Sequence, residues 1–391
     1  MLTQVWFKNY KGLRDIKLNL GRFNVLVGPN ACGKTSVLDA IRQLSMVTYR
    51  DPSLVFNGLW DKRVLYNQTA KSNTISIGAI GEMFNNDIKS NIKVEVTIDV
   101  AAKPRPLRKD GNIDGPDGAF SVEAEINDKP LNIPKGHQIN WESAAHPLVE
   151  ALNSSYLRLD YFKLAEPTYS DSIIPQLEAG GFGLATVLNN MQASNPSEFS
   201  QLIEDVCSVV PIITSIRTTR VPLKITRPQT ITINGQTITN EIKEDVIGHQ
   251  ILLDTQYAKN IPPSGISEGT LIVLGILTEL HSQPYAKLLL LDDIEHGLHP
   301  KAQKNLIDLL RIILNKNSDL QIIATSHSPY LIDSLEPSEV ILFDIGDEGE
   351  SIAKRLIDHP DHKHWLETMT PGEFWSFAGE SWVKGKQDKD K

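Results

Sequence analysis

The chain has 391 residues, which is too many for one ordinary core and enough for two or three packed units. Its formal net charge of −9 excludes a surface that is basic throughout, although it is compatible with a local basic groove. Two cysteines give neither a disulfide framework nor a zinc cluster, and no apolar stretch is long enough for a signal peptide or a membrane span. We therefore expect a cytoplasmic protein with no membrane partner.

The N-terminal part begins with strands and a helix and then changes to an alternating pattern. Strands are expected at residues 5–7, 16–20 and 23–27, and a helix with one apolar face follows the glycine-rich turn at 28–33. From about residue 74 to 133, short alternating stretches separated by turns indicate antiparallel strands.

The middle of the chain is first helical and then β-like. Residues 144–213 carry a helical pattern with Pro and Gly breaks, and residues 215–253 carry strands joined at an Asn234-Gly235 hairpin turn. The last third alternates apolar strands with helices, which indicates a parallel sheet covered on both faces. The elements expected there are strands at 288–291, 321–324 and 340–343 and a helix at 301–314.

These patterns predict an α/β fold in three parts. The parts are an N-terminal lobe with an antiparallel β subdomain at 1–143, an inserted helical subdomain at 144–214 and a C-terminal lobe at 215–391.

A phosphate-loop pattern, Gly-Pro-Asn-Ala-Cys-Gly-Lys-Thr, lies at residues 28–35 between a buried strand and a helix. Glycines let successive backbone N–H groups curl around phosphates, and the helix N-terminus adds partial positive charge. Lys34 is expected to reach the β- and γ-phosphates of ATP, and Thr35 is expected to bind Mg²⁺. The residues expected around the nucleotide are Asn30, Ala31, Cys32, Gly33, Lys34, Thr35 and Ser36.

The strand at 288–291 ends in acidic residues. Carboxylates at the C-terminal end of a parallel strand face the ligand crevice, so Asp292 is expected to hold Mg²⁺ and Asp293 to orient the attacking water. If Asp293 is not catalytic, Glu295 or His327 becomes the candidate. A strand capped by solvated acids is the structural alternative, and the phosphate loop upstream argues against it.

Two further polar segments flank this strand. Ser267, Glu268 and Gly269 precede it at the expected start of a helix, whose N–H groups can face an anion. His327 follows the next strand, where it can sense the γ-phosphate, although the Ser-Pro step after it also suits a simple helix cap.

These four motifs, in this order, resemble the ABC-type ATPase heads of the RecF, SMC and OLD families. The chain is most similar to the compact OLD-like AAA ATPases, and the resemblance extends to Phe7–Leu13, Pro371–Trp375 and Gly379–Trp382. It implies a P-loop ABC-type head that dimerises head to head or forms a higher oligomer. Each ATP would then lie between one phosphate loop and the partner's Ser267-Glu268-Gly269 segment.

The chain departs from the family pattern in three places. Asp293 stands where Glu is usual, which implies slow hydrolysis because small misplacements are costly in rate. Cys32 replaces a Gly or Ser, either as a tolerated small side chain or as a redox-sensitive one. We expect no nuclease domain like that of OLD proteins in this sequence, because the acids Asp344, Asp347, Glu348 and Glu350 suit a solvated loop better than a metal site.

The resemblance implies a dimeric ATPase that switches an effector in trans, namely a nuclease, in anti-phage defence or DNA surveillance. The first alternative is a RecF- or SMC-like repair ATPase that acts on DNA directly. The second is a scaffold that ATP holds together without turnover. Basic residues that can touch DNA phosphates, or that are simply solvated, form two groups. They are Lys103, Arg105, Arg108 and Lys109, and Arg217, Arg220, Lys224 and Arg227.

Overall fold

The structure is a computed structural model that describes residues 1–50, 52–57, 65–67, 70, 72–85, 88–101, 120–131, 146–233, 236–282 and 286–384. Its contacts group the chain into two compact units. Unit 1 comprises Met1–Tyr156, Ala286–Glu295 and Leu310–Lys391, and unit 2 comprises Leu157–Tyr285 and His296–Leu309. The three-part division expected from the sequence stays a prediction. No helix in the described ranges is long and apolar enough to cross a bilayer.

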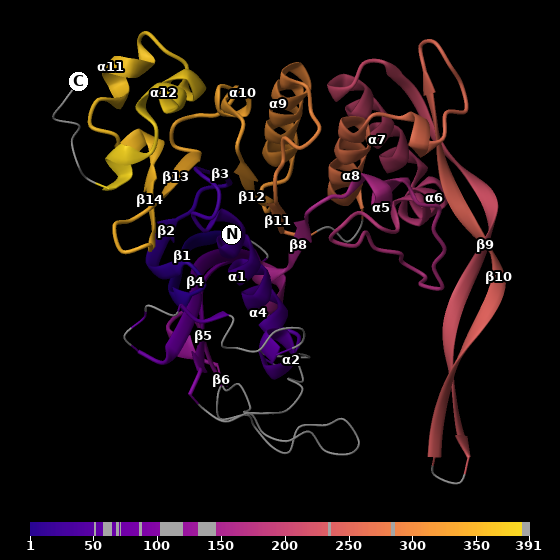
Figure 1. The fold of residues 1–391 in the computed structure, drawn as a ribbon, viewed down its shortest axis with the longest axis horizontal. Coiled ribbons are helices and arrows are strands. Elements are labelled where there is room, and N and C mark those ends of the chain that lie inside the picture. The colour runs from indigo at the N-terminus through magenta and orange to yellow at the C-terminus, as the bar shows by residue number, and fades with distance from the viewer. Residues whose placement is uncertain are drawn as a thin grey trace. The chain divides into compact units, whose positions relative to one another are not determined.

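Among the described residues of unit 1, six strands form an antiparallel sheet (Figure 1). In spatial order they are β2 (Leu13–Asn19), β1 (Leu2–Tyr10), β4 (Thr74–Asn85), β5 (Ile88–Asp99), β6 (Phe120–Ile126) and β7 (Lys129–Pro130). Alternation sets the register: Phe7 lies opposite Ile77, and both side chains are fully buried. This sheet is the antiparallel β subdomain expected from the sequence.

A second sheet of unit 1 carries the strands that lead into the nucleotide motifs. Within the described chain its order is β14 (Ser351–Arg355), β13 (Val340–Ile345), β3 (Phe23–Val27), β12 (Gln321–Ser326), β11 (Leu288–Leu291) and β8 (Ser154–Leu157). Strands β13, β3, β12 and β11 are parallel, and β14 is antiparallel to β13. Every residue of β3 and β11 is buried, which explains why β11 is wholly apolar and β3 is apolar except for Asn24.

Helix α1 (Lys34–Val47) joins the cores of the two sheets. Its Leu38 and Ile41 belong to one buried cluster with Phe7 of the antiparallel sheet and Ile323 and Phe343 of the second sheet. The other described helical segments of unit 1 are α2 (Pro52–Asn57), α4 (His146–Leu152), α10 (Pro329–Ile332), η2 (Leu356–Asp358), α11 (His362–Leu366), α12 (Pro371–Ala378) and η3 (Ser381–Lys384). A shared buried core therefore holds the helix that follows the phosphate loop.

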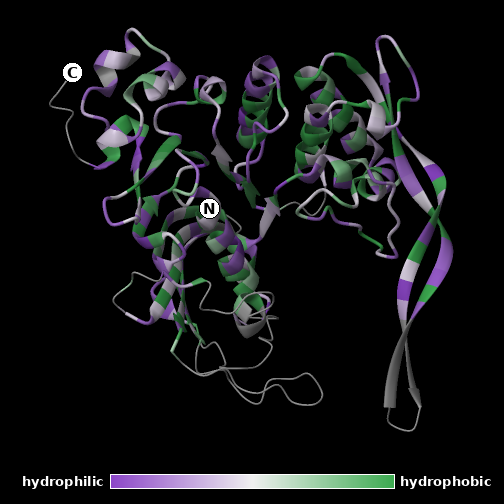
Figure 2. Cartoon of the chain, in the orientation of Figure 1, coloured by the Kyte–Doolittle hydropathy of each residue, from purple (hydrophilic) through white to green (hydrophobic). Residues whose placement is uncertain are grey.

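Unit 2 combines helices with a long β-hairpin. Its described helical segments are α5 (Tyr161–Ala165), α6 (Leu184–Ser194), α7 (Pro196–Val209), η1 (Pro263–Gly265) and α8 (Glu268–His281), while α9 (Pro300–Lys316) runs on into unit 1. Strands β9 (Ile213–Ile233) and β10 (Gln236–Thr255) pair with each other along their whole length. Figure 2 shows hydrophilic and hydrophobic stretches alternating along this hairpin.

Two expectations were wrong in detail. The stretch expected to be helical contains the short strand β8 and an irregular segment before α6. A strand of four residues is too short to show a hydrophobic period in the sequence, and β8 forms because it pairs beside β11 in the sheet. The acidic run is not one loop, since Asp344 lies in β13. The Asn234-Gly235 turn, the basic segment with Lys103, Arg105, Arg108 and Lys109, and the C-terminal tail beyond residue 384 lie outside the described residues.

Candidate nucleotide-binding site

The backbone of the phosphate loop requires its glycines. Gly28 has φ 142° and Gly33 has φ 104°, and Ala31 between them also adopts a positive φ of 65°. A Cβ at Gly28 would lie 2.2 Å from the Phe343 carbonyl oxygen, and one at Gly33 would lie 2.6 Å from Ser351 Oγ. Neither position can accept a side chain without displacing its neighbours.

Helix α1 begins where an anion can bind. Gly33 is its N-cap and provides no side-chain hydrogen bond, and the first turn of the helix contains no acidic residue. The backbone N–H groups of that turn therefore face the loop with their partial positive charge uncompensated by a side chain. This arrangement suits a phosphate group.

Lys34 is buried, with only 5% of its surface exposed. Its Nζ donates to the carbonyl oxygens of Gly28 and Pro29, both at 2.9 Å, and lies 3.7 Å from Cys32 Sγ. Carbonyl oxygens do not neutralise an ammonium group, so the buried positive charge is matched to an anion. The loop, the uncapped helix and Lys34 together fit the phosphates of a nucleotide.

Cys32 is fully buried beside this lysine. Burial raises the pKa of its thiol, and the nearby Lys34 opposes that rise without cancelling it. The thiol is therefore protonated and shielded, which favours the small tolerated side chain over the redox-sensitive one.

Three hydroxyl groups surround the Asp292 carboxylate at the end of β11. Thr35 Oγ1 donates to its Oδ1 at 3.1 Å, Thr325 Oγ1 donates to the same oxygen at 2.8 Å, and Tyr156 OH donates to Oδ2 at 3.1 Å. Asp292 is 6% exposed. A hydroxyl and a carboxylate at this separation are hard oxygen ligands of the kind that Mg²⁺ prefers.

The three catalytic candidates follow this carboxylate and the neighbouring strand. The Asp293 N–H donates to Thr325 Oγ1 at 2.8 Å, and Asp293 adopts a left-handed backbone with φ 57°. The backbone N–H of His327 donates to Glu295 Oε1 at 2.6 Å, and the His327 side chain is exposed. Unit 1 thus brings Thr35 and Asp292 together, and it joins Glu295 to His327.

The expected signature segment lies in unit 2. Ser267 is the N-cap of α8, and its Oγ lies 2.7 Å from Thr270 Oγ1. Glu268 Oε1 lies 3.0 Å from His296 Nε2. A Cβ at Gly269 would lie 2.3 Å from the Gly297 carbonyl oxygen, so only glycine allows this approach.

Two residues around Asp292 received no role from the sequence. Thr325 lies near the end of β12, two residues before His327, and the sequence assigns a role only to the histidine. Tyr156 lies in β8, inside a stretch expected to be helical, and the Arg42 guanidinium carbon lies 5.0 Å from the centre of its ring. Only the placement of β8 beside β11 shows that Tyr156 reaches the carboxylate.

The parallel sheet, the phosphate loop before α1 and the acidic end of β11 define an ABC-type P-loop fold. The family model described as "AAA domain, putative AbiEii toxin, Type IV TA system" matches residues 23–333, and the chain belongs to that family.

One curated protein is similar to part of the chain. "Septu protein PtuA" of Bacillus thuringiensis is 30% identical over 103 residues, which are 24% of this chain and 25% of that protein. The chain thus spans about a quarter of the length of this relative.

Two solved structures share the fold at low sequence identity. An Smc head bound to the C-terminal winged-helix domain of ScpA has a TM-score of 0.56 and 13% identity, with 91% of this chain and 98% of that one covered. The Smc head domain with an extended coiled coil, bound to the C-terminal domain of ScpA derived from Pyrococcus furiosus, has a TM-score of 0.54 and 12% identity. That match covers 94% of this chain and 99% of the other.

Proposed function

We propose that this chain binds and hydrolyses Mg²⁺-ATP as a homodimer and thereby switches a partner effector, a nuclease, in anti-phage defence or DNA surveillance. The observation that carries the proposal is the meeting of Thr35, at the start of α1, with Asp292, at the end of β11. A phosphate loop and a carboxylate placed in this way serve one phosphoryl-transfer site.

Each residue has a separate task at this site. Lys34 binds the β- and γ-phosphates, while Thr35 and Asp292 hold Mg²⁺, which when bound neutralises charge on the phosphate oxygens. Thr325 and Tyr156 orient the Asp292 carboxylate through their hydroxyls. Asp293 orients the attacking water, and His327 contacts the γ-phosphate.

The proposal of a dimer is supported by the signature segment, Ser267-Glu268-Gly269, and by the family resemblance. Ser267 and Glu268 are exposed at the start of α8, where they can contact a nucleotide held by a partner subunit. The Smc heads that share this fold are bound to domains of ScpA, which supports a partner protein for this chain as well. The similarity to Septu protein PtuA supports a role in defence.

A scaffold that ATP holds together without turnover is the second candidate. It is favoured by the short carboxylate and left-handed backbone of Asp293, which together restrict how far the side chain can reach toward a water. Direct action on DNA has weaker support, because Arg217 is paired with Asp254 and Arg227 with Asp171 and Glu244.

The test measures phosphate release by the purified chain with Mg²⁺-ATP, with chelator in place of Mg²⁺ as the control. The same chain is then mixed with the product of a neighbouring nuclease gene, and DNA cleavage is followed with ATP, with ADP and without nucleotide. Nucleotide-dependent cleavage supports the switch. Tight ATP binding without phosphate release supports the scaffold. DNA cleavage at the same rate with ATP, with ADP and without nucleotide contradicts the proposed function.

A further inference from the structure

Three arginines line a hollow of unit 1 at the end of β3 opposite the phosphate loop. Arg22 immediately precedes β3, which runs from Phe23 to Val27 and leads into Gly28. The hollow has a volume of about 550 Å³, which is in the range of small-molecule sites. Its lining residues are Asn19, Leu20, Gly21, Arg22, Phe23, Arg311, Leu314, Asn315, Ser338, Glu339 and Arg355.

The positive charge of this hollow is only partly balanced. Arg311 Nη2 lies 2.5 Å from Glu339 Oε2, and Glu339 is the one acidic residue among the lining residues. Arg22 donates to the carbonyl oxygens of Leu314 and Asn317, and these groups carry no full charge. Among the residues that line the hollow, three guanidinium groups thus share one carboxylate.

Arg355 is held in the same way by neutral acceptors. It donates to the carbonyl oxygens of Ser338 and Asn19 and, at 3.0 Å, to Asn24 Oδ1. Burial lowers the pKa of this guanidinium, although the carboxylate of Asp358 opposes the effect. Desolvation disfavours a charged group, and a nearby anion would favour it.

Donor groups are also left over. A guanidinium has five N–H donors in a planar fork that matches the oxygens of a phosphate. The Nε of Arg22 is buried and has no hydrogen-bond partner within the described chain. A buried donor without an acceptor is costly, so the guanidinium of Arg22 keeps hydrogen-bonding capacity that the protein itself does not use.

We propose that Arg22, Arg311 and Arg355 form a second anion site that binds a terminal phosphate group. Fixed, weakly hydrated guanidinium groups favour a phosphate monoester over a monovalent anion. The phosphate can belong to a free phosphorylated metabolite or to the 5′ end of a nucleic acid. The site is distinct from the nucleotide site, because the two lie at opposite ends of β3.

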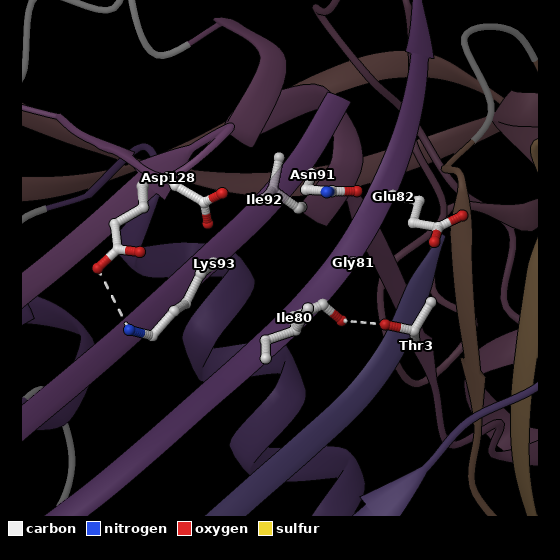
Figure 3. A pocket seen from close by; sticks show the side chains of 9 residues that line it. Thr3, Ile80, Gly81, Glu82, Asn91, Ile92, Lys93 and Asp128 are labelled. Carbon is white, nitrogen blue, oxygen red and sulfur yellow. Dashed lines mark hydrogen bonds and ion pairs between the residues drawn. The ribbon is translucent and has the colours of Figure 1, made fainter. Parts of the chain in front are cut away.

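A hollow on the antiparallel sheet provides the matched control. It has a volume of about 300 Å³ and is lined by Lys93 together with Glu82, Glu125 and Asp128. Lys93 Nζ forms an ion pair with Glu125 Oε1 at 3.2 Å, which Figure 3 marks with a dashed line. Three acids against one base make this hollow unsuited to anions, so Lys93→Gln removes a cation without touching the proposed site.

The experiment titrates inorganic phosphate into the full chain by isothermal calorimetry. Lys34→Ala serves as the background, because it removes the binding contribution of the phosphate loop. A second arm compares a short oligonucleotide carrying a 5′-phosphate with the same oligonucleotide carrying a 5′-hydroxyl. Tighter binding of the 5′-phosphorylated oligonucleotide would assign the site to nucleic-acid ends. Equal binding of the two oligonucleotides, together with binding of inorganic phosphate, would assign the site to free phosphorylated compounds.

Two substitutions with opposite expected effects make the result decisive. Arg311→Gln should weaken phosphate binding about tenfold or more, because a charge-assisted bond is lost. Glu339→Gln should tighten it severalfold, since it frees Arg311 while keeping an oxygen that accepts from the Glu336 N–H. Unchanged affinity in both variants, or an equal loss in Lys93→Gln, overturns the proposal. A variant that merely destabilised the fold could not tighten binding.

Discussion

Glu295 and His327 are joined by a 2.6 Å hydrogen bond from the His327 backbone N–H to Glu295 Oε1. The second oxygen of this carboxylate, Oε2, is buried and has no hydrogen-bond partner among the described residues. The carboxylate that follows β11 therefore fixes the segment that follows β12. From this bond we expect Glu295 to have a positioning role, in which its side chain acts through His327.

Glu295→Ala should lower turnover about tenfold while leaving ATP affinity within about twofold of the wild type, because His327 loses its anchor but the phosphate loop is untouched. Glu295→Gln keeps an oxygen that accepts the same N–H and should retain most of the activity. Single-turnover phosphate release and equilibrium ATP binding measure the two effects. A Gln variant as inactive as the Ala variant would instead make Glu295 the catalytic base.

Asp293 is tested by removing its charge without changing its shape. Asp293→Asn should bind ATP with near-normal affinity, turn over at least about a hundredfold more slowly and accumulate an ATP-bound dimer. Asn also tolerates the left-handed backbone of this position, where φ is 57°, so the fold should be unaffected. Single-turnover phosphate release at saturating ATP separates the chemical step from dimer opening.

Asp293→Glu tests whether the family's usual residue would work better here. A longer side chain is disfavoured at a positive φ, so we expect lower thermal stability and no gain in turnover. Asp293→Gly, which relaxes the backbone and removes the carboxylate, is the matched control and should be stable but inactive. Unchanged turnover in Asp293→Asn and Asp293→Glu alike would show that Asp293 is not catalytic.

The sequence predicted the motif residues of this fold better than the residues that hold them in place. The phosphate loop and β11 are continuous segments with a strong local pattern, so their elements were placed correctly. Tyr156 and Thr325 hold Asp292 from other strands, and a single sequence carries no signal for such contacts. The sequence did not predict the arginine hollow for the same reason, since Arg22 and Arg311 are far apart in the chain and are brought together only by folding.

Lys34→Ala should abolish ATP binding and hydrolysis while the chain keeps a cooperative thermal transition. Within the described part of the chain, the hydrogen bonds of Lys34 Nζ go to oxygens and a sulfur of its own loop, so we expect its charge to serve the ligand more than the core. Lys11→Ala is the matched control, because Lys11 pairs with Asp39 of α1 at 2.5 Å without reaching the loop. Wild-type ATP affinity in the Lys34 variant would refute the assignment of the site.

His281 should make the stability of unit 2 depend on pH. Its ring nitrogens lie 3.1 Å from Glu198 and 2.9 Å from Asp205 on α7. Burial alone lowers the pKa of His281, but the hydrogen bonds to Asp205 and Glu198 outweigh it and raise the pKa above its ordinary value of 6.5. The folded state therefore binds the proton more tightly than the unfolded state.

The contribution of His281 to the free energy of unfolding is complete below pH 6.5 and is lost as the pH rises through the raised pKa. Chemical unfolding from pH 6 upward should show this loss in the wild type and a flatter profile in His281→Gln. His364→Gln, which changes an exposed histidine, is the control and should follow the wild type. Parallel profiles for the wild type and His281→Gln would contradict the assignment.

Ser267 tests whether the ATP sites are shared between subunits. Ser267 is exposed at the N-cap of α8, so an arginine there can extend into solvent in the monomer without disturbing the helix. At a dimer interface the same arginine would collide with the partner and its nucleotide. Ser267→Arg should therefore bind ATP normally as a monomer but fail to dimerise and to hydrolyse ATP. Ser264→Arg, at an exposed serine three residues upstream, is the matched control.

Mixing the two inactive variants gives the sharper result. A heterodimer of Ser267→Arg with Lys34→Ala has one composite site in which both defects meet, and one in which an intact phosphate loop faces an intact Ser267. The mixture should thus recover up to about half of the activity per dimer, since one of two sites is whole. Phosphate release is measured after mass photometry or cross-linking has shown that heterodimers form. No recovery in a mixture that contains heterodimers would argue against ATP sites that are shared between subunits.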